Sequence, residues 1–287
     1  MPTVFVTGAT GNIGGYVVTA LVEQEFTVVA AVRNKESNKH SFAQGVVVRE
    51  FDFSAPTDKE VLAGCDYVFM MLPPGLPHSK EVFGRFIGLM QQAGIQHVIF
   101  ISVQGAEKHS SLPHNGIEKL LSEASISHSV LRPSYFMQNL STTWLADIKN
   151  KNRLYVPAGK AVFTWIAVED IAAAAVAIFQ QPGKHKGAAY TLTGAEQYSF
   201  FEVAGILSTQ LQRKIVYRPA NALLFFIQQQ RKGMSTTQSL AVTLIHFLQA
   251  FQERAPITAT VETLTGRRPM LLREFIEKYK NCFSKVE

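Results

Sequence analysis

The chain has 287 residues, of which 47% are hydrophobic and 17% charged, with two cysteines and a formal net charge of +6. This composition excludes a disordered or collagen-like chain and a disulfide framework, and it allows one large domain or two unequal ones. Residues 1–150 hold 11 Lys/Arg and 13 Asp/Glu, whereas residues 151–287 hold 17 and 9. The C-terminal bases are scattered, without a finger or basic-zipper pattern, which argues against a nucleic acid as partner.

The first 135 residues alternate short β-branched runs with helical patterns, which predicts a parallel sheet with helices on both faces. Strands are expected at Thr3–Thr7, Thr27–Val32, Gly45–Glu50, Tyr67–Leu72, His97–Ser102 and Ser129–Leu131. Helices are expected at Asn12–Glu23, Asp58–Ala63, Lys80–Ala93 and His114–Ala124. The fold class that follows is α/β, a doubly wound parallel sheet.

After Pro133 this alternation stops. Further strands are expected at Leu154–Val156, Phe163–Ala167, Ala189–Leu192 and Ile215–Tyr217, and further helices at Glu169–Phe179, 199–211, 220–230, 236–252, 256–265 and Leu271–Tyr279. We therefore predict one domain over residues 1–150, to which residues 163–180 return. Residues 151–287 would form a smaller α+β region on the substrate or partner side.

No stretch reaches the roughly 18 consecutive apolar residues of a membrane span. The nearest, Leu240–Phe251, contains His246 and Gln249, and we expect it to be a buried helix. The N-terminus has no basic region followed by a cleavage site, and Cys65 and Cys282 do not form a zinc or CxxC pattern. We expect a cytoplasmic protein without a membrane association and without a metal site.

A glycine motif, Val4-Phe5-Val6-Thr7-Gly8-Ala9-Thr10-Gly11-Asn12-Ile13-Gly14, follows the first strand and opens the first helix. This is the context of a dinucleotide-binding turn. Gly8 would permit the tight turn, Gly11 the approach of the pyrophosphate and Gly14 close helix packing, with the helix N-terminus facing the phosphates. The residues expected to bind the cofactor here are Gly8, Thr10, Gly11, Asn12, Ile13 and Gly14. The alternative is a glycine turn without a ligand.

The second strand ends in Ala31-Val32-Arg33-Asn34-Lys35, with no acidic residue before Glu36. An NAD enzyme usually offers Asp or Glu here for the ribose 2′-hydroxyl, whereas an arginine fork suits a 2′-phosphate. Arg33, with Lys35 nearby, therefore favours NADP(H) over NAD(H). The alternative is that Arg33 is a surface residue with no ligand.

Two further strand ends supply candidate contacts. Asp52 follows the third strand and is placed to accept from the adenine amino group while Phe53 packs against the base; a simple loop aspartate is the alternative. Leu72 and Pro73 end the fourth strand, at the edge over which a dinucleotide runs toward its nicotinamide. The alternative there is that the prolines only break the strand.

Several segments together resemble one known family. They are the glycine motif, Ile101-Ser102-Val103, His114-Asn115-Gly116-Ile117-Glu118-Lys119, Leu131-Arg132-Pro133-Ser134-Tyr135-Phe136-Met137-Gln138-Asn139-Leu140, Phe163-Thr164-Trp165-Ile166-Ala167-Val168-Glu169-Asp170-Ile171-Ala172 and Thr265-Gly266-Arg267-Arg268-Pro269. In order and spacing they resemble the NmrA-like branch of the atypical short-chain dehydrogenases/reductases. The resemblance implies a Rossmann-type domain with a small C-terminal substrate domain and NADP(H) as ligand. It also implies either quinone- or dye-reducing activity or NADP sensing without turnover.

Typical enzymes of that superfamily place Ser at the end of strand five and a Tyr four residues before a Lys on the next helix. Ser102 and Lys119 match, but the tyrosine position is Asn115, which cannot serve as an acid. Lys119 remains a candidate for binding the nicotinamide ribose. The alternative is a solvated lysine paired with Glu118 or Glu123.

His114 and Tyr135 are the remaining candidate proton donors, although a histidine at a helix start is commonly a cap or surface residue. Tyr135, Phe136 and Asn139 follow the sixth strand, where open α/β sheets place their ligand crevice. They would form an apolar wall over the nicotinamide, or they would be core between the two regions.

Two functions remain open at this point. The first is an oxidoreductase that transfers hydride from NADPH to a quinone-like or other conjugated electrophile, a reaction that needs positioning more than a strong acid. The second is a non-catalytic regulator that senses NADP(H) and binds a protein partner. The expected partners are a small apolar or aromatic substrate and either a protein or a second copy of the chain.

Overall fold

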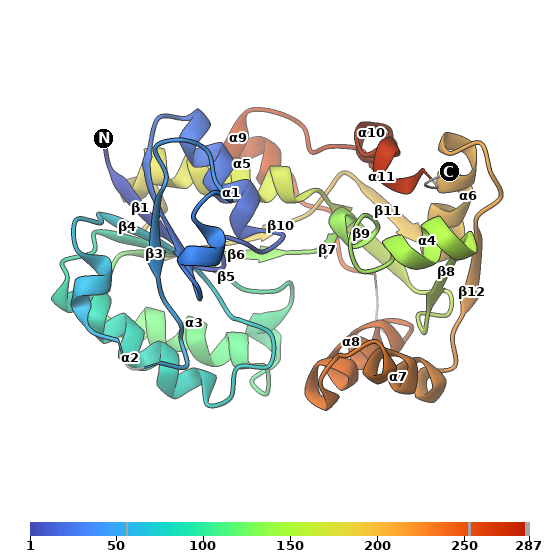
Figure 1. Cartoon of the computed structure of the whole chain (residues 1–287), viewed down its shortest axis with the longest axis horizontal. Helices are drawn as coiled ribbons and strands as arrows, with labels where there is room; N and C mark the ends of the chain where they lie inside the picture. The colour runs from blue at the N-terminus through green and yellow to red at the C-terminus, as the bar shows by residue number, and fades with distance from the viewer. Residues whose placement is uncertain (56, 252–253, 285–287) are drawn as a thin grey trace. The chain divides into compact units, whose positions relative to one another are not determined.

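The computed structural model describes residues 1–55, 57–251 and 254–284, which form two compact units (Figure 1). Unit 1 comprises Met1–Pro133, Val168–Leu192 and Thr260–Arg267. Unit 2 comprises Ser134–Ala167, Thr193–Ala259 and the described residues from Arg268 onward. The first boundary therefore falls at Pro133, and residue 150 lies inside unit 2.

Unit 1 is built on a seven-stranded sheet in the order β10-β6-β5-β4-β1-β2-β3, and all its neighbouring strands are parallel. The strands are β1 (Thr3–Val6), β2 (Thr27–Val32), β3 (Val47–Glu50), β4 (Tyr67–Met71), β5 (His97–Ile101), β6 (His128–Pro133) and β10 (Ala188–Leu192). β1, β2, β4 and β5 are buried along almost their whole length, as strands covered on both faces must be. The predicted doubly wound, Rossmann-type α/β fold is confirmed.

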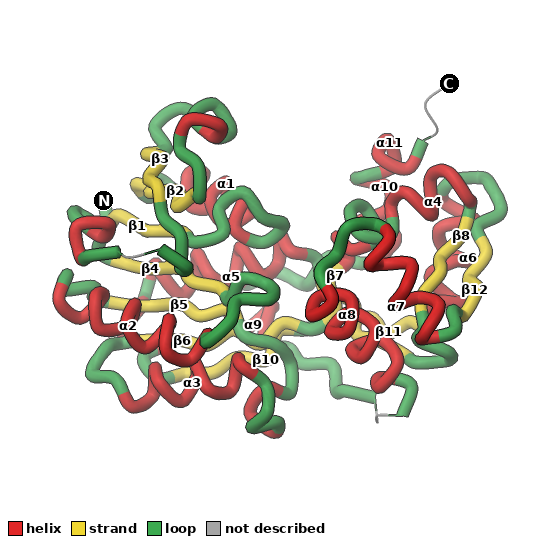
Figure 2. The backbone as a smooth tube through the Cα atoms, turned by 60° about the horizontal axis from the view of Figure 1, so that its bottom comes forward, coloured by secondary structure: helices red, strands yellow, loops and turns green. Residues whose placement is uncertain are grey.

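Helices cover the two faces of this sheet (Figure 2). α1 (Gly14–Glu23), α5 (Val168–Gln180) and α9 (Thr260–Thr265) lie together on one face, and α2 (Ser79–Gln92) and α3 (Pro113–Glu123) on the other. Short 3-10 turns complete the unit: η1 (Glu36–Asn38), η2 (Lys59–Leu62), η3 (Ala106–Lys108) and η5 (Pro182–His185). η2 replaces the α-helix expected at 58–63 because the segment is only one capped turn, with Asp58 accepting from the backbone N–H of Glu60.

Two expectations about the sheet and its cover were wrong. Ala189–Leu192, expected in the smaller region, belongs to β10, which adds a seventh strand beside β6. The helix expected at 256–265 is the shorter α9, and it also belongs to unit 1. Both pieces return to the sheet after long excursions of the chain, and local patterning carries no information about such distant pairing.

Unit 2 contains two small sheets. β9 (Val162–Ile166) pairs antiparallel with β11 (Glu196–Ser199) and parallel with β7 (Tyr135–Phe136), and β8 (Arg153–Val156) pairs parallel with β12 (Val216–Pro219). Its helices are η4 (Met137–Asn139), α4 (Leu145–Lys151), α6 (Phe200–Gln210), α7 (Ala222–Arg231), α8 (Thr236–Gln249), α10 (Leu272–Lys278) and α11 (Lys280–Phe283). β7, β11 and α4 were not predicted. The expected helix 236–252 ends at Gln249 in the structure, and its residue 252 lies outside the described residues.

Unit 2 has its own aromatic core, with Trp144, Trp165, Phe200, Phe225 and Phe275 almost completely buried. A Ser199–Glu202 capping box fixes the start of α6, which packs on this core. Gly194 allows a close backbone approach, since a Cβ atom there would lie 1.7 Å from the carbonyl oxygen of Trp165. Tyr135, an aromatic residue that the sequence left open as either site or core, packs against this cluster.

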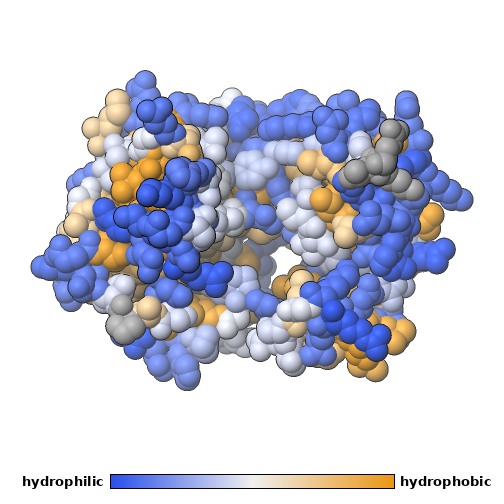
Figure 3. Space-filling view, in the orientation of Figure 1, coloured by the Kyte–Doolittle hydropathy of each residue, from blue (hydrophilic) through white to orange (hydrophobic). Residues whose placement is uncertain are grey.

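α8 is not the buried helix that we expected. It buries its polar residues Ser239, Thr243 and His246, whereas Leu240 and Ile245 are 49% and 59% exposed. Figure 3 shows hydrophobic side chains at the surface in the region of α7 and α8. The apolar content of the segment predicted a helix correctly, but it could not predict which face packs on the core.

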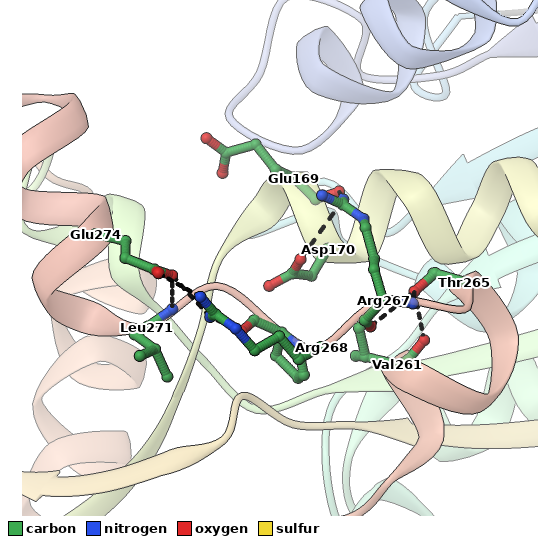
Figure 4. A network of polar contacts seen from close by, with 9 residues as sticks. Glu169, Asp170, Val261, Thr265, Arg267, Arg268, Leu271 and Glu274 are labelled. Carbon is green, nitrogen blue, oxygen red and sulfur yellow. Dashed lines mark hydrogen bonds and ion pairs between the residues drawn. The ribbon is translucent and has the colours of Figure 1, made fainter.

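The motif Thr265-Gly266-Arg267-Arg268-Pro269 divides its two arginines between the units (Figure 4). In unit 1, Arg267 lies 3.6 Å from the buried carboxylate of Asp170, in the first turn of α5. In unit 2, Arg268 pairs with Glu274, which also accepts from the backbone N–H of Leu271 at 2.9 Å and so caps α10. The motif therefore anchors one helix in each unit.

Within the part of the chain that the structure describes, no helix combines the length and the hydropathy needed to cross a membrane. Cys65 is buried and Cys282 exposed, and both are free thiols. The same described residues contain no group of three or more His, Cys, Asp or Glu side chains arranged to hold a metal ion.

Candidate active site

The glycine turn lies where the order of the strands reverses, between β1 and its neighbour β4. Thr7 donates its backbone N–H to Phe69 and accepts from the backbone N–H of Met71, so the chain leaves β1 against the end of β4. Gly8 has φ +62°, and a Cβ there would lie 2.6 Å from Sδ of Met71. In open α/β sheets, ligands bind at such a switch point.

The turn and the helix that follows are packed too closely for side chains. The backbone N–H of Gly11 donates to the carbonyl of Gly8 at 2.8 Å, and a Cβ on Gly14 would lie 2.2 Å from that same carbonyl oxygen. Thr10 and Asn12 are exposed, whereas Ile13 is buried at the N-cap of α1. The N-cap residue Ile13 has no polar side-chain group that could cap α1, and the first turn of the helix contains no acidic residue. Such an N-terminus is suited to an anion.

Arg33 follows β2, which lies next to β1. Its side chain is exposed, and among the described residues none forms an ion pair or hydrogen bond with its guanidinium. The nearby Glu50 accepts instead from the backbone N–H of Lys35 at 3.4 Å. The planar fork of Arg33 is therefore available to a ligand at the carboxyl edge of the sheet.

The other predicted nucleotide contacts follow β3 and β4. Asp52 is half-buried and accepts from the backbone N–H of Ser54 at 2.8 Å, which fixes the loop. Phe53 stacks on Phe83 with ring centroids 4.7 Å apart and packs on the core of unit 1. Leu72 packs on that same core, next to the half-buried Pro73. Because all these strands are parallel, their carboxyl ends meet at one edge with the glycine turn.

Ser102 follows β5 at the same edge, and its hydroxyl hydrogen is already used. It donates to Oε1 of Glu118 on α3, whose carboxylate also accepts two hydrogen bonds from Arg132, at 3.1 Å and 2.6 Å. Arg132 also lies 3.4 Å from the carboxylate of Glu107. Ser102 can therefore accept a hydrogen bond from a ligand, but it cannot donate one without releasing Glu118.

Glu118 and Arg132 are residues whose role sequence reasoning missed. The available signal was an acidic residue on the helix after β5 and an arginine near the end of β6. Their partnership depends on tertiary structure. The expected alternative pairing of Lys119 with Glu118 is replaced by the Glu118–Arg132 pair.

The predicted residues of α3 lie in different environments. Asn115, at the position of the usual tyrosine, is buried and donates from Nδ2 to the carbonyl of Ala106 at 3.0 Å. Lys119, one turn later, is exposed, and no described residue forms an ion pair with it. His114 is half-buried near Phe100, and burial lowers the pKa of its imidazole although Glu118 acts against this shift. His114 is therefore disposed to be neutral, and Lys119 is available to a ligand.

Tyr135, Phe136 and Asn139 belong to unit 2. Nδ1 of His246 lies 2.7 Å from the carbonyl of Val242, so Nδ1 carries the hydrogen and Nε2 accepts one. The Tyr135 hydroxyl donates to that Nε2 at 2.8 Å and accepts from the indole N–H of Trp144 at 3.1 Å. Burial raises the pKa of Tyr135, and burial lowers the pKa of His246 to about 4.

This chain of hydrogen bonds ties β7 and α8 into the core of unit 2. A role for Tyr135 as proton donor would require its bond to His246 to break. Phe136 pairs with Ile166 in the β7–β9 ladder and is half-buried, and the carbonyl of Asn139 accepts from the backbone N–H of Trp144. The contribution of these three residues to cofactor binding stays a prediction.

The residues of unit 1 fit a phosphorylated dinucleotide. A glycine turn with no room for Cβ atoms, a helix N-terminus with the apolar Ile13 at its N-cap, and an arginine and a lysine without an ion-pair partner among the described residues lie on elements that end or begin at one sheet edge. The diphosphate would bind at the turn, Arg33 would take the 2′-phosphate, and Lys119 would take a ribose. These assignments rest on donor chemistry and placement.

Comparison with known proteins gives a consistent family. The model of the NmrA-like family matches residues 2–266. The NAD(P)H azoreductase of Xenophilus azovorans is 30% identical over 289 residues, which is 98% of this chain and 99% of that protein. The triphenylmethane reductase of Citrobacter sp. complexed with NADP(H) superposes with a TM-score of 0.81 at 22% identity, covering 96% of this chain and 99% of that one.

An NADPH-dependent quinone oxidoreductase from Escherichia coli, solved with NADPH, gives a TM-score of 0.79 at 22% identity and covers 97% of this chain and 100% of that one. At this identity the two solved structures establish a common fold only. The family model and the azoreductase cover nearly the whole sequence. The chain belongs to the NmrA-like family.

Proposed function

We propose that the protein is an NADPH-dependent reductase that acts on a flat, conjugated electrophile such as a quinone. The observation that carries the proposal is the glycine turn at the β1/β4 switch point, with Ile13 at the N-cap of α1 and with Arg33, which has no partner among the described residues, directly after β2. Relatives named as an azoreductase and a quinone oxidoreductase support a substrate of this class. Bound NADPH supplies the hydride.

The residues at the sheet edge support this substrate class because they do not offer the usual proton donor. Asn115 stands where a proton-donating tyrosine is usual, and the Ser102 hydroxyl hydrogen is held by Glu118. A quinone tolerates this, since the negative charge that develops on it is delocalised and water can supply the proton. A simple ketone would need the missing acid. Carbonyl-to-alcohol reduction is therefore disfavoured.

The test is steady-state oxidation of NADPH with a panel of acceptors. The panel contains benzoquinones, naphthoquinones and an azo dye, with saturated ketones and aldehydes of similar size as matched controls. We expect turnover with the conjugated acceptors and none with the saturated ones. Tight NADPH binding without turnover on any acceptor would contradict the reductase proposal.

That last outcome would favour a second candidate function, an NADP(H)-sensing regulator that binds a protein partner. The observation that favours it is Asn115, which is buried and bonded to the Ala106 carbonyl at the position of the usual catalytic acid. Affinity capture in NADP+ and in NADPH would then identify partners that depend on the redox state. A partner list that does not change with that state would exclude sensing.

A further inference from the structure

Unit 2 contains a basic pocket that the proposed function does not use. Its lining comes from the junction of α4 and β8, with Lys151, Asn152 and Arg153, and from the region of β12, with Lys214, Val216 and Arg218. The pocket has a volume of about 310 Å3. Four of its six lining residues are cations and a single one is apolar, so the pocket suits a small, highly charged anion rather than an apolar ligand.

The strand pairing explains why the cations converge. β8 and β12 are parallel, with Arg153 opposite Val216 and Tyr155 opposite Arg218. Leu154 and Tyr217 are buried in the core of unit 2, so the alternate residues of both strands face away from it. Two segments about 60 residues apart in the sequence thereby place their basic side chains on one face.

The positive charge of this face is poorly neutralised. Asp147 on α4 is buried and lies 3.4 Å from Lys151, 3.2 Å from Arg153 and 3.1 Å from Lys232. Burial alone would raise the pKa of Asp147, but hydrogen bonds from Lys232 and Arg153 and the charges of Lys232 and Lys151 lower this pKa below its usual value. One carboxylate therefore serves three cations. Lys214 and Arg218 are exposed, and within the described ranges neither has a carboxylate partner.

Arg153 is held in place for binding. Its Nε donates to Asp147 at 3.2 Å, and its guanidinium lies 4.7 Å from the centroid of the Tyr155 ring. Among the described residues, no acceptor bonds its two terminal nitrogens, which form the fork that matches a phosphate. An arginine fixed in this way loses little conformational entropy when a ligand binds.

We propose that this pocket binds a small soluble ligand that carries a diphosphate group. Two adjacent phosphates would meet the Arg153 fork and the uncompensated charges of Lys214 and Arg218. The site lies wholly in unit 2 and is separate from the glycine turn of unit 1.

The probe is inorganic pyrophosphate, titrated calorimetrically into the full chain. The test variant is Lys214→Gln/Arg218→Gln. A matched variant, Lys160→Gln/Arg254→Gln, removes the same charge from another unit 2 pocket, which contains Glu202. Gly14→Ala tests the dinucleotide turn, where the diphosphate of NADPH would bind. We expect saturable binding to wild type, about tenfold or more weaker binding to the test variant, and little change in both other variants.

Lys214 and Arg218 are exposed and form no ion pair with a described residue, so the test variant should keep the thermal midpoint of the wild type. If the double variant were less stable, the two single variants would be titrated separately, and each should weaken binding. Three results would overturn the proposal: no pyrophosphate binding, equal losses in both double variants, or a loss in Gly14→Ala alone. If the protein sedimented with phosphoinositide vesicles but did not bind pyrophosphate, a soluble ligand would likewise be excluded.

Discussion

Gly14 is the residue at which the candidate site depends most directly on backbone geometry. A methyl group there would lie 2.2 Å from the carbonyl oxygen of Gly8, so Gly14→Ala must push α1 away from the turn. Overpacking of this kind costs about 1–3 kcal/mol. We expect a loss of that size in the free energy of unfolding, measured in urea, together with weaker NADPH binding.

Gly88→Ala is the matched control. Gly88 lies inside α2, and a Cβ there would meet no heavy atom within 4 Å. Alanine in a helix interior is more stable than glycine by about 0.5–1 kcal/mol, so this variant should be slightly stabilised. If Gly14→Ala were as stable as Gly88→Ala, the backbone of the turn would not lie as close to Gly14 as the structure shows.

Lys119 and Arg33 are expected to differ in what they recognise. Lys119 would contact a ribose that NADPH and NADH share, whereas Arg33 would contact the 2′-phosphate that only NADPH carries. Lys119→Gln should therefore weaken both cofactors by a similar factor of about 5–10, measured by fluorescence titration. Unchanged affinity for both NADPH and NADH would show that Lys119 is a solvated lysine and does not bind the cofactor.

At the residue scale, local signals were readable from the sequence and tertiary ones were not. Gly8 and Gly14 were predicted because a turn between a strand and a helix demands them at fixed spacing. Arg33 was a candidate because it directly follows a strand of the sheet. The pairing of Glu118 with Ser102 and Arg132 was missed because it joins β5, α3 and β6, which only the folded sheet brings together.

At the scale of elements, His97 connects β5 to the amino ends of β6 and β10. Ser129 donates its hydroxyl to the carbonyl of His185 at 2.7 Å, so it must accept from Nε2–H of His97 at 3.0 Å. Nδ1 of His97 then accepts from the hydroxyl of Ser127 at 2.8 Å. The network holds the imidazole in its neutral form, completely buried at this end of the sheet.

Acid should weaken this junction. Burial, with additional repulsion from His128 and His185, lowers the pKa of His97 from 6.5 to about 4. A lowered histidine pKa means that its contribution to stability is complete above pH 6.5 and is lost as the pH falls toward 4. In urea unfolding, we expect the wild type to lose about 2–3 kcal/mol more than His97→Gln over this range.

The exposed His40 provides the control. His40→Gln should follow the wild-type pH dependence, because the residue is not part of the network. The same dependence in His97→Gln as in the wild type would show that His97 does not contribute to acid lability.

The elements of unit 1 could be predicted well because, in a parallel sheet covered by helices, the spacing of apolar residues along the sequence matches the faces that become buried. The strands β1, β2, β4 and β5 are apolar on both faces, and amphipathic helices alternate with them. β10 was assigned to the wrong region because a short edge strand carries no signal of its distant partner. α8 had the right type and the wrong orientation, since Ser239, Thr243 and His246 pack inward.

At the scale of the whole molecule, the net charge of +6 separates into different local roles. Arg213 bonds three backbone carbonyls, those of Ile148, Lys149 and Phe283, and so holds unit 2 together. Arg267 pairs with Asp170 in unit 1. Beside β12, Lys214 and Arg218 have no carboxylate partner among the described residues, which motivates the pyrophosphate titration. The excess charge is thus partly structural and partly concentrated at one pocket.

The proposed reaction is the reduction of a conjugated acceptor by NADPH, with Arg33 selecting NADPH over NADH. The measurement that tests it most directly is the ratio of kcat/KM for NADPH to that for NADH on one quinone, in wild type and in Arg33→Ala. We expect the wild type to favour NADPH and the variant to lose about 1–3 kcal/mol of that preference, roughly a 5- to 150-fold drop in the ratio. Absence of turnover with either cofactor would contradict the proposed reaction, and an equal ratio in both proteins would contradict the proposed role of Arg33.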